Sequence, residues 1–263
     1  MWYIAVRRGG EIQRGFNSPL NLCNSRNSLP AFIFPTIPPI RVTFSLKQQS
    51  RVKYKAFLFD MNGTMIDDMQ YHIKAWHQIL NGLGAGISME RMKEECYGKN
   101  DELLERIFPG RFSAEEKLRM SMDKERAYQQ AFRPYLKLLD GLPELLEKAK
   151  QHGIKMAIGS AAIMFNIDFV LDELNIRSYF DALISADEVK VSKPHPETFL
   201  VCAEKLGVDP VDCLVFEDAP KGVEAAARGG MDCAVITSLH EKEDFAGMKN
   251  VVRFMKDFRD FPW

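Results

Sequence analysis

The fold of this chain is decided by residues 57–64, Phe-Leu-Phe-Asp-Met-Asn-Gly-Thr. An apolar run that is rich in aromatic residues and ends before Asn-Gly predicts a buried strand that presents Asp60 at its end. Parallel sheets place their chemistry in the crevice beyond the carboxyl ends of the strands. Asp60 is therefore a candidate nucleophile, although an aspartate after a strand is also typical of a turn or a helix cap.

Three later segments share this arrangement, in which a polar residue stands at the end of a strand-like run or in a loop after one. They are Ser160 after the run 154–159, Lys193 in the proline-rich turn 192–196, and the pair Glu217-Asp218 after the run 213–216. Each one has a simpler interpretation as a helix cap, a solvated charge or a turn former. Together, in this order along the chain, they predict a single site that handles phosphate.

With these four segments in order, the chain resembles the haloacid dehalogenase-like superfamily of phosphatases and phosphomutases. Residues 68–76, Asp-Met-Gln-Tyr-His-Ile-Lys-Ala-Trp, are similar to the approach to the helical cap in its β-phosphoglucomutase-like branch, and residues 222–227 also fit that branch. The resemblance covers about residues 53–255. It is specific to the superfamily and much less so to the substrate.

The remaining pattern alternates strands and helices, which predicts an α/β fold with a Rossmann-like parallel sheet and helices on both faces. Strands are predicted at 55–60, 154–159, 181–185, 213–217 and 232–236, and helices at 142–152, 163–175, 195–206 and 220–229. Amphipathic helices replace the strand signal after Asp68, and the clearest begins with a capping box at residues 113–116. We therefore expect a helical cap over 69–135, inserted into a catalytic core made of 52–68 and 136–263.

Residues 1–51 do not fit this unit. They hold five of the 13 prolines, and seven basic residues against one acidic residue, Glu11. An acid-poor leader of this kind is typical of an organellar transit peptide. The alternative is a mis-called start, with translation beginning near Val52. In either case we expect this segment to be unstructured and outside the fold.

The composition of the chain limits which classes of binding partner are expected. The net charge of −1 gives no reason to expect a nucleic acid. No run approaches the roughly 20 apolar residues that are needed to span a bilayer, so no membrane partner is expected. We predict a monomer that acts on a small phosphorylated metabolite. It would be cytoplasmic, or organellar if the leader is a genuine transit peptide.

The resemblance implies a mechanism in which Asp60 attacks phosphorus and forms an aspartyl-phosphate. Mg2+ would be the cofactor, held by Asp60, the backbone carbonyl of Asn62, and Asp218, with Glu217 as a further ligand. Hard oxygen ligands of this kind suit that ion.

The resemblance also implies which residues hold the phosphoryl group. Ser160 and the backbone N–H of Ala161, near a helix start, would bind its oxygens. Lys193 would neutralise the transferring group and keep Asp60 ionised.

Asn62 departs from the family pattern, which usually has a second aspartate there as general acid and base. A carboxamide donates hydrogen bonds but does not exchange a proton near neutral pH. General acid–base assistance is worth about 10²–10⁴ in rate, and its loss matters least when the leaving group is already a stable anion. We therefore expect an Mg2+-dependent phosphohydrolase that favours activated substrates such as pyrophosphate. A phosphomutase or sugar phosphatase, or a weakly active module that binds phosphorylated ligands, remain alternatives.

Several residues of the cap are candidates for proton transfer or substrate contact. His72 could replace the missing acid, because an imidazole can exchange a proton near neutral pH, or it could simply pack at the junction of cap and core. Gly98 and Lys99 lie in a polar loop that resembles the family's specificity loop, and Lys99 could meet a second anionic group of the substrate. Trp76 is either a substrate contact or part of the cap's own core.

Overall fold

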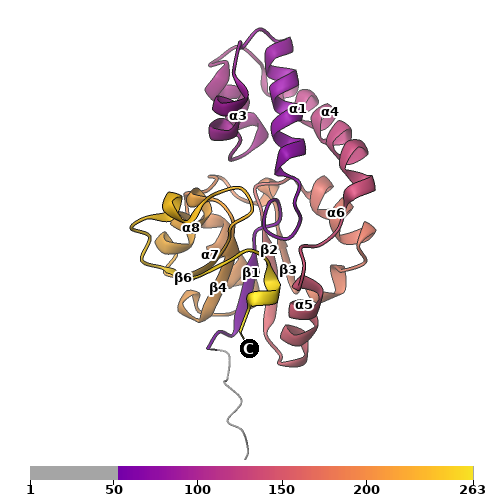
Figure 1. The fold of residues 1–263 in the computed structure, drawn as a ribbon. Coiled ribbons are helices and arrows are strands. Elements are labelled where there is room, and N and C mark those ends of the chain that lie inside the picture. Colours follow the sequence, from indigo (N-terminus) through magenta and orange to yellow (C-terminus); the bar gives the residue numbers. More distant parts are fainter. Residues whose placement is uncertain (1–52, 263) are drawn as a thin grey trace, which may run out of the picture. The chain divides into compact units, whose positions relative to one another are not determined.

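Six parallel strands form one sheet in the order β3-β2-β1-β4-β5-β6 (Figure 1). This computed structural model describes residues 53–262, so the predicted leader, 1–51, lies outside the described residues. The strands are β1 Ala56–Phe59, β2 Lys155–Gly159, β3 Ala182–Ile184, β4 Cys213–Glu217, β5 Asp232–Ile236 and β6 Val251–Met255. The predicted α/β class with a Rossmann-like parallel sheet is confirmed.

Strand β1 lies at the centre of the sheet and is buried on both faces. It pairs with β2 on one side and β4 on the other, and its four residues are 0% exposed. Phe57 and Phe59 point to the face that helices α5 (Leu142–Gln151) and α6 (Met164–Glu173) cover. Burial of each such aromatic side chain contributes about 1.5–3 kcal/mol, which explains why this short apolar run becomes the central strand.

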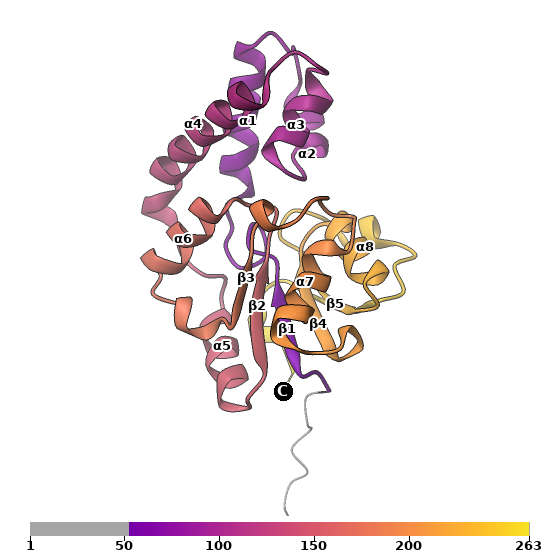
Figure 2. The ribbon, with the colours of Figure 1, turned by 180° about the vertical axis from the view of Figure 1, so that it is seen from behind.

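The opposite face of the sheet has its own core. Ala56 and Leu58 point to that side and pack with residues of α7 (Glu197–Leu206) and α8 (Pro220–Arg228). Figures 1 and 2, which view the molecule from opposite sides, show helices on both faces of the sheet. The sheet is thus the middle of three layers, and its strand ends remain open for other residues.

The sequence missed one strand, β6. It lies at the edge of the sheet and pairs only with β5, and Val252 and Arg253 in its middle are exposed. An edge strand with a solvated side does not need the continuous apolar run that marks a buried parallel strand, so the pattern did not reveal it. The other five strands and the four predicted helices of the core lie within two residues of their predicted bounds.

Five α-helices lie between β1 and β2, and the first four form a group apart from α5. These four are α1 Met69–Gly82, α2 Met89–Glu95, α3 Asn100–Ile107 and α4 Ala114–Phe132, in the segment where the sequence predicts a helical cap. Their apolar sides share a separate small core that includes Trp76, Leu80 and Leu104. Helix α4 begins with the predicted capping box, in which Ser113 Oγ accepts from the Glu116 backbone N–H and Glu116 Oε2 accepts from that of Ser113.

Figure 1 shows the helices of the cap beyond the carboxyl ends of the strands, on the side of the sheet where Asp60 follows β1. Within residues 53–262, no helix combines the length and the apolar character needed to cross a bilayer. The chemistry of the site is therefore to be sought between the sheet edge and the cap.

Candidate active site

Lys193 joins the ends of two neighbouring strands. Asp60 follows β1 directly, and Glu217 is the last residue of β4. The Lys193 Nζ donates to Asp60 Oδ1 at 2.6 Å and to Glu217 Oε1 at 2.8 Å, and all three side chains are buried. The candidate nucleophile predicted from the sequence is thus held by the predicted lysine.

The electrostatics of this cluster favour an additional cation. Burial raises the pKa of Asp60 to about 7, with a further contribution from Glu217, although Lys193 opposes the shift. Burial also raises the pKa of Asp218 well above its usual range, together with the nearby charges of Glu217 and Asp60. Burial alone would lower the pKa of Lys193, but its two carboxylate partners outweigh that effect and raise it. One ammonium group therefore balances three carboxyl groups that lie out of water.

Glu217, predicted as a further metal ligand, accepts hydrogen bonds through both of its oxygens. Its Oε1 accepts from Lys193, and its Oε2 accepts at 2.8 Å from the backbone N–H groups of both Asp218 and Ala219. A Cβ on Gly222 would lie 1.8 Å from Glu217 Oε1, so only glycine fits beside this carboxylate. Both oxygens are engaged, and the side chain orients Lys193 and the loop that carries Asp218.

The oxygen donors at this edge of the sheet suit Mg2+. They include the Asp60 and Asp218 carboxylates and the backbone carbonyl of Asn62, with Glu217 beside them. Asp218 Oδ1 accepts from Thr64 at 3.1 Å, and Oδ2 lies so close to Gly63 that a Cβ there would be 2.2 Å away. Within residues 53–262, no three His, Cys, Asp or Glu side chains converge as a metal group. Hard oxygens beside an excess of buried negative charge are the donors that this ion requires.

Ser160 and Ala161 lie in the loop between β2 and α6, at the same edge of the sheet. Ser160 is 1% exposed; its Oγ accepts from the Ala162 backbone N–H at 3.1 Å and donates to Asn62 Oδ1 at 3.4 Å. Both Ser160 and Ala161 line the same cavity as Asp60. The topology therefore brings the four predicted motifs together.

Asn62 belongs to a polar network that the sequence did not reveal. Its Nδ2 donates to Asp68 Oδ2 at 2.5 Å and lies 3.1 Å from His72 Nε2. Asp68 is 0% exposed and also accepts from the Gly63 backbone N–H and the Tyr128 hydroxyl. Asp68 directly precedes α1, where an aspartate is typical of a helix start. The sequence therefore does not indicate that Asp68 belongs to the site.

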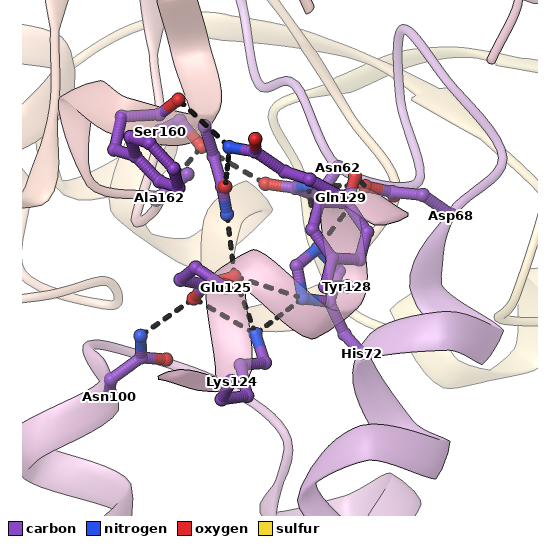
Figure 3. A network of polar contacts seen from close by, with 12 residues as sticks. Asn62, Asp68, His72, Asn100, Lys124, Glu125, Tyr128, Gln129, Ser160 and Ala162 are labelled. Atoms are coloured by element: carbon purple, nitrogen blue, oxygen red, sulfur yellow. Dashed lines mark hydrogen bonds and ion pairs between the residues drawn. The ribbon is translucent and has the colours of Figure 1, made fainter. Parts of the chain in front are cut away.

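His72 is packed at the junction of cap and core and also faces the cavity. It is 7% exposed, stacks on the ring of Tyr128 at a centroid distance of 3.9 Å, and is among the cavity-lining residues. Lys124 Nζ lies 2.6 Å from its Nδ1, and Asp68 Oδ2 lies 3.2 Å from its Nε2 (Figure 3). A lysine that donates to Nδ1 assigns the ring proton to Nε2, which faces Asp68 and Asn62.

The remaining cap residues divide in their placement. Gly98 and Trp76 both line the cavity, although Trp76 is also part of the cap's own core. Lys99 lies outside the cavity lining, because its Nζ donates to the backbone carbonyl of Val189. The prediction that Lys99 meets an anionic group of the substrate is therefore not supported by its geometry.

One cavity of about 270 Å³ collects these groups between the sheet edge and the cap. Its lining includes, from the core, Asp60, Asn62, Ser160, Ala161, Asn166, Lys193 and Asp218, and, from the cap, His72, Trp76, Gly98, Asn100, Lys124 and Glu125. Its volume is near the lower end of the usual range for small-molecule sites. The arrangement can hold a compact anion against Asp60 while cap side chains contact the rest of the ligand.

Comparisons with known proteins agree with this geometry. The family model of haloacid dehalogenase-like hydrolases matches residues 54–230. A fructose-1-phosphate phosphatase of Escherichia coli is 32% identical over 188 residues, which are 71% of this chain and 98% of the relative. A β-phosphoglucomutase of Bacillus subtilis is 33% identical and covers 67% of this chain and 80% of its own length. A hexitol phosphatase of Escherichia coli is 29% identical, over 72% of this chain and 86% of the relative.

Solved structures show the same likeness. The crystal structure of β-phosphoglucomutase from Clostridium difficile superposes with a TM-score of 0.71 at 29% identity, and covers 80% of this chain and 94% of that one. A sheet-and-cap hydrolase with an aspartate at the end of its central strand is the class that fold and site define. The chain belongs to the haloacid dehalogenase-like hydrolase family, in its β-phosphoglucomutase-like branch. Its activity is that of a phosphatase.

Proposed function

We propose that the enzyme hydrolyses the phosphate monoester of a small sugar or polyol through an aspartyl-phosphate on Asp60. The observation that carries this proposal is the bond from Lys193 to Asp60 at 2.6 Å, inside a cavity that also holds Ser160 and Asp218. The relatives that are named as phosphatases of fructose 1-phosphate and of hexitols support this substrate class.

Each core residue has a chemical role in this proposal. An Asp60 oxygen attacks phosphorus, the P–O bond to the alcohol breaks, and the alcohol oxygen takes a proton from water. A water molecule then splits the acyl phosphate, which releases phosphate and regenerates the carboxylate. Lys193 offsets the negative charge of the phosphoryl oxygens, while Ser160 and the Ala161 N–H orient them. Because the site is buried, these charges act with little screening by water.

Asp60, the Asn62 carbonyl and Asp218 would hold Mg2+. When bound, the ion neutralises charge on the phosphoryl oxygens. Its binding also favours the ionised form of Asp60, which burial otherwise disfavours, and the ionised form is the nucleophile.

Asn62 favours a second candidate substrate class. It occupies the place where a general acid would protonate the departing oxygen, and its amide donates to Asp68 instead. Pyrophosphate and acyl phosphates release stable anions and need no such proton. General acid catalysis is worth about 10²–10⁴ in rate, and its absence should slow the hydrolysis of these substrates only slightly. Phosphomutase activity is less favoured, because a carboxamide cannot take the proton of an attacking sugar hydroxyl. A module without turnover is least favoured, because Asp60, Lys193 and Asp218 are all in place.

The test is phosphate release from a panel that contains sorbitol 6-phosphate, fructose 1-phosphate, pyrophosphate, acetyl phosphate and phenyl phosphate. We expect activity that requires Mg2+ and is lost in Asp60→Asn. Asp123→Asn, a change of the same kind at an exposed residue of α4, should retain full activity. Turnover by Asp60→Asn at the wild-type rate would overturn the proposal.

The same panel separates the two candidate classes. If sugar phosphates exceed pyrophosphate by orders of magnitude, the preference for activated substrates is wrong and the phosphatase proposal stands. A separate assay with glucose 1-phosphate tests for a mutase, which would convert this substrate to its 6-isomer faster than it releases phosphate.

A further inference from the structure

A buried carboxylate on the cap side of the cavity is not used by the chemistry described so far. Glu125, on α4, is 2% exposed and lines the cavity. Although burial opposes ionisation, the charge of Lys124 and the hydrogen bonds from two amide side chains lower the pKa of Glu125, so the group is charged at neutral pH. A charge in this position is costly unless several donors surround it.

The donors around Glu125 come from three separate elements. Asn100 Nδ2, on α3, donates to Oε1 at 2.7 Å, and Asn166 Nδ2, on α6 of the core, donates to Oε2 at 2.6 Å. Lys124 Nζ donates to both oxygens, at 2.9 and 3.0 Å. Figure 3 shows the contacts of Glu125 with Asn100 and Lys124. These three residues and Asn166 all line the cavity. We call Glu125, Asn100 and Asn166 the amide–carboxylate cluster.

The cluster can exchange one of its bonds for a bond to a ligand. Lys124 directs two contacts at a single carboxylate while it also contacts His72 Nδ1. If a hydroxyl group of a ligand replaced one of them, Lys124 would still be paired with both Glu125 and His72. The two amides provide N–H donors and carbonyl acceptors, and a hydroxyl group can both donate and accept, so the chemistries match.

The surrounding charges disfavour a second phosphate at the same place. The Glu125 carboxylate repels an anion, and Lys124 already pairs with it. Lys99 is bonded to the Val189 carbonyl, and Lys221, which lines the cavity together with Lys93, lies over the Tyr97 ring at 3.6 Å. Beside Glu125 itself, a neutral and hydroxylated part of the ligand is therefore favoured over a second phosphate.

We propose that the amide–carboxylate cluster is the specificity determinant of this phosphatase, and that it binds the hydroxyl groups of a neutral polyol or sugar whose single phosphate lies at Asp60. The proposal rests on the proposed function and adds the residues that select the substrate. Since Asn166 belongs to the core and Asn100 and Glu125 to the cap, substrate bound at the cluster would contact both parts.

The test compares two monoesters, one with a polyol chain and one without hydroxyl groups. In Glu125→Gln, we expect KM for sorbitol 6-phosphate to rise about tenfold or more, as for the loss of a hydrogen bond to a charged group, with kcat changed less than about threefold. KM for phenyl phosphate should change less than about twofold, and Asp123→Asn should change neither. Fructose 1,6-bisphosphate should be a poorer substrate than sorbitol 6-phosphate for the wild-type enzyme.

Two results would overturn the inference. One is an equal loss on both monoesters in Glu125→Gln, which indicates a purely structural role, and the other is equal or better turnover of the bisphosphate. If Glu125→Gln does not fold, Asn100→Ala takes its place. We expect a rise in KM for sorbitol 6-phosphate only. An equal rise in KM for both substrates would contradict the inference.

Binding separates this inference from the proposed function. Calorimetry of sorbitol 6-phosphate with Asp60→Asn and with Asp60→Asn/Glu125→Gln needs no turnover. If the wild-type enzyme hydrolyses no monoester, the proposed function is wrong. About tenfold weaker binding of sorbitol 6-phosphate by the double variant would even then support a ligand-binding role for the amide–carboxylate cluster. Equal binding by the two variants would refute it.

Discussion

Asn62 donates its side-chain amide to Asp68 Oδ2 at 2.5 Å, and Asp68 has no exposed surface. An amide at position 62 and a carboxylate at position 68 therefore form a complementary pair. The usual family residue at position 62, an aspartate, would place a second carboxylate in contact with the buried Asp68. The amide at position 62, where the family pattern has an aspartate, is thus complementary to the carboxylate of Asp68. No sequence motif marks Asp68.

Asn62→Asp should destabilise the protein by about 1–3 kcal/mol, because the buried Asp68 loses a hydrogen-bond donor and meets a second negative charge. The exchanged pair Asn62→Asp/Asp68→Asn should recover most of this loss, since one amide again faces one carboxylate. Urea unfolding of the three proteins measures the difference. Additive losses in the double variant would show that the two positions are not coupled.

The exchanged pair also tests the missing general acid. Because it supplies a carboxyl group at position 62, we expect kcat on sugar phosphates to rise by about tenfold or more, while pyrophosphate hydrolysis changes little. Steady-state rates on both substrates check this. Unchanged rates on sugar phosphates would mean that the proton comes from another group or is not limiting.

Lys193→Met should lower kcat/KM on every substrate by about 10²–10³, the typical cost of removing one group that stabilises developing negative charge. It also leaves Asp60 and Glu217 facing each other without their shared cation. Lys190→Met, at an exposed position of the same loop, is the matched control and should retain activity. A loss confined to one substrate would contradict a role for Lys193 at the phosphoryl group.

Without metal, the protein should lose stability as the pH rises. The folded pKa of Asp60, about 7, exceeds its ordinary value of 3.8, so between these limits the folded state binds more protons than the unfolded state. The free energy of unfolding should fall by up to about 4 kcal/mol across this window, and the raised pKa of Asp218 acts in the same direction.

Mg2+ should therefore raise the melting temperature more at pH 8 than at pH 5, because it binds the ionised carboxylates. Thermal unfolding in EDTA and in Mg2+ at both pH values measures this. Asp60→Asn should reduce both the pH dependence and the effect of the metal. An equal Mg2+ shift at the two pH values would contradict the assignment.

Gly222→Ala should destabilise the protein by about 1–3 kcal/mol and reduce activity, since the added methyl group meets the Glu217 carboxylate that holds Lys193. Gly82→Ala is the control, as no described atom lies within 4 Å of a Cβ there and alanine favours a helix. Gly82→Ala should be neutral or stabilising in thermal unfolding, with normal activity. Wild-type activity in Gly222→Ala would show that the position of Glu217 is not critical.

The sequence was informative wherever one local pattern had one physical explanation. Continuous apolar runs such as 57–59 can only be satisfied by burial on both faces of a sheet, so five strands were predictable. The edge strand β6 was missed because exposure on one side removes that constraint. The sequence did not reveal that the oxygens of Glu217 accept from Lys193 and two backbone groups, because these partners are set by the tertiary structure.

By itself, the sequence determined the parallel sheet, the inserted helices and the set of polar residues that follow the strands, because periodicity and strand ends are local properties of the chain. Only the tertiary structure decided which side chains meet: Asn62 with Asp68, His72 with Lys124, and Glu125 with Asn100 and Asn166. These pairs are separated by up to 52 residues along the chain. Hydrogen bonds act only between groups in contact, so partners that are distant along the chain produce no periodic sequence pattern. Such pairs can be identified only from the tertiary structure, in which cap and core lie on two sides of one cavity.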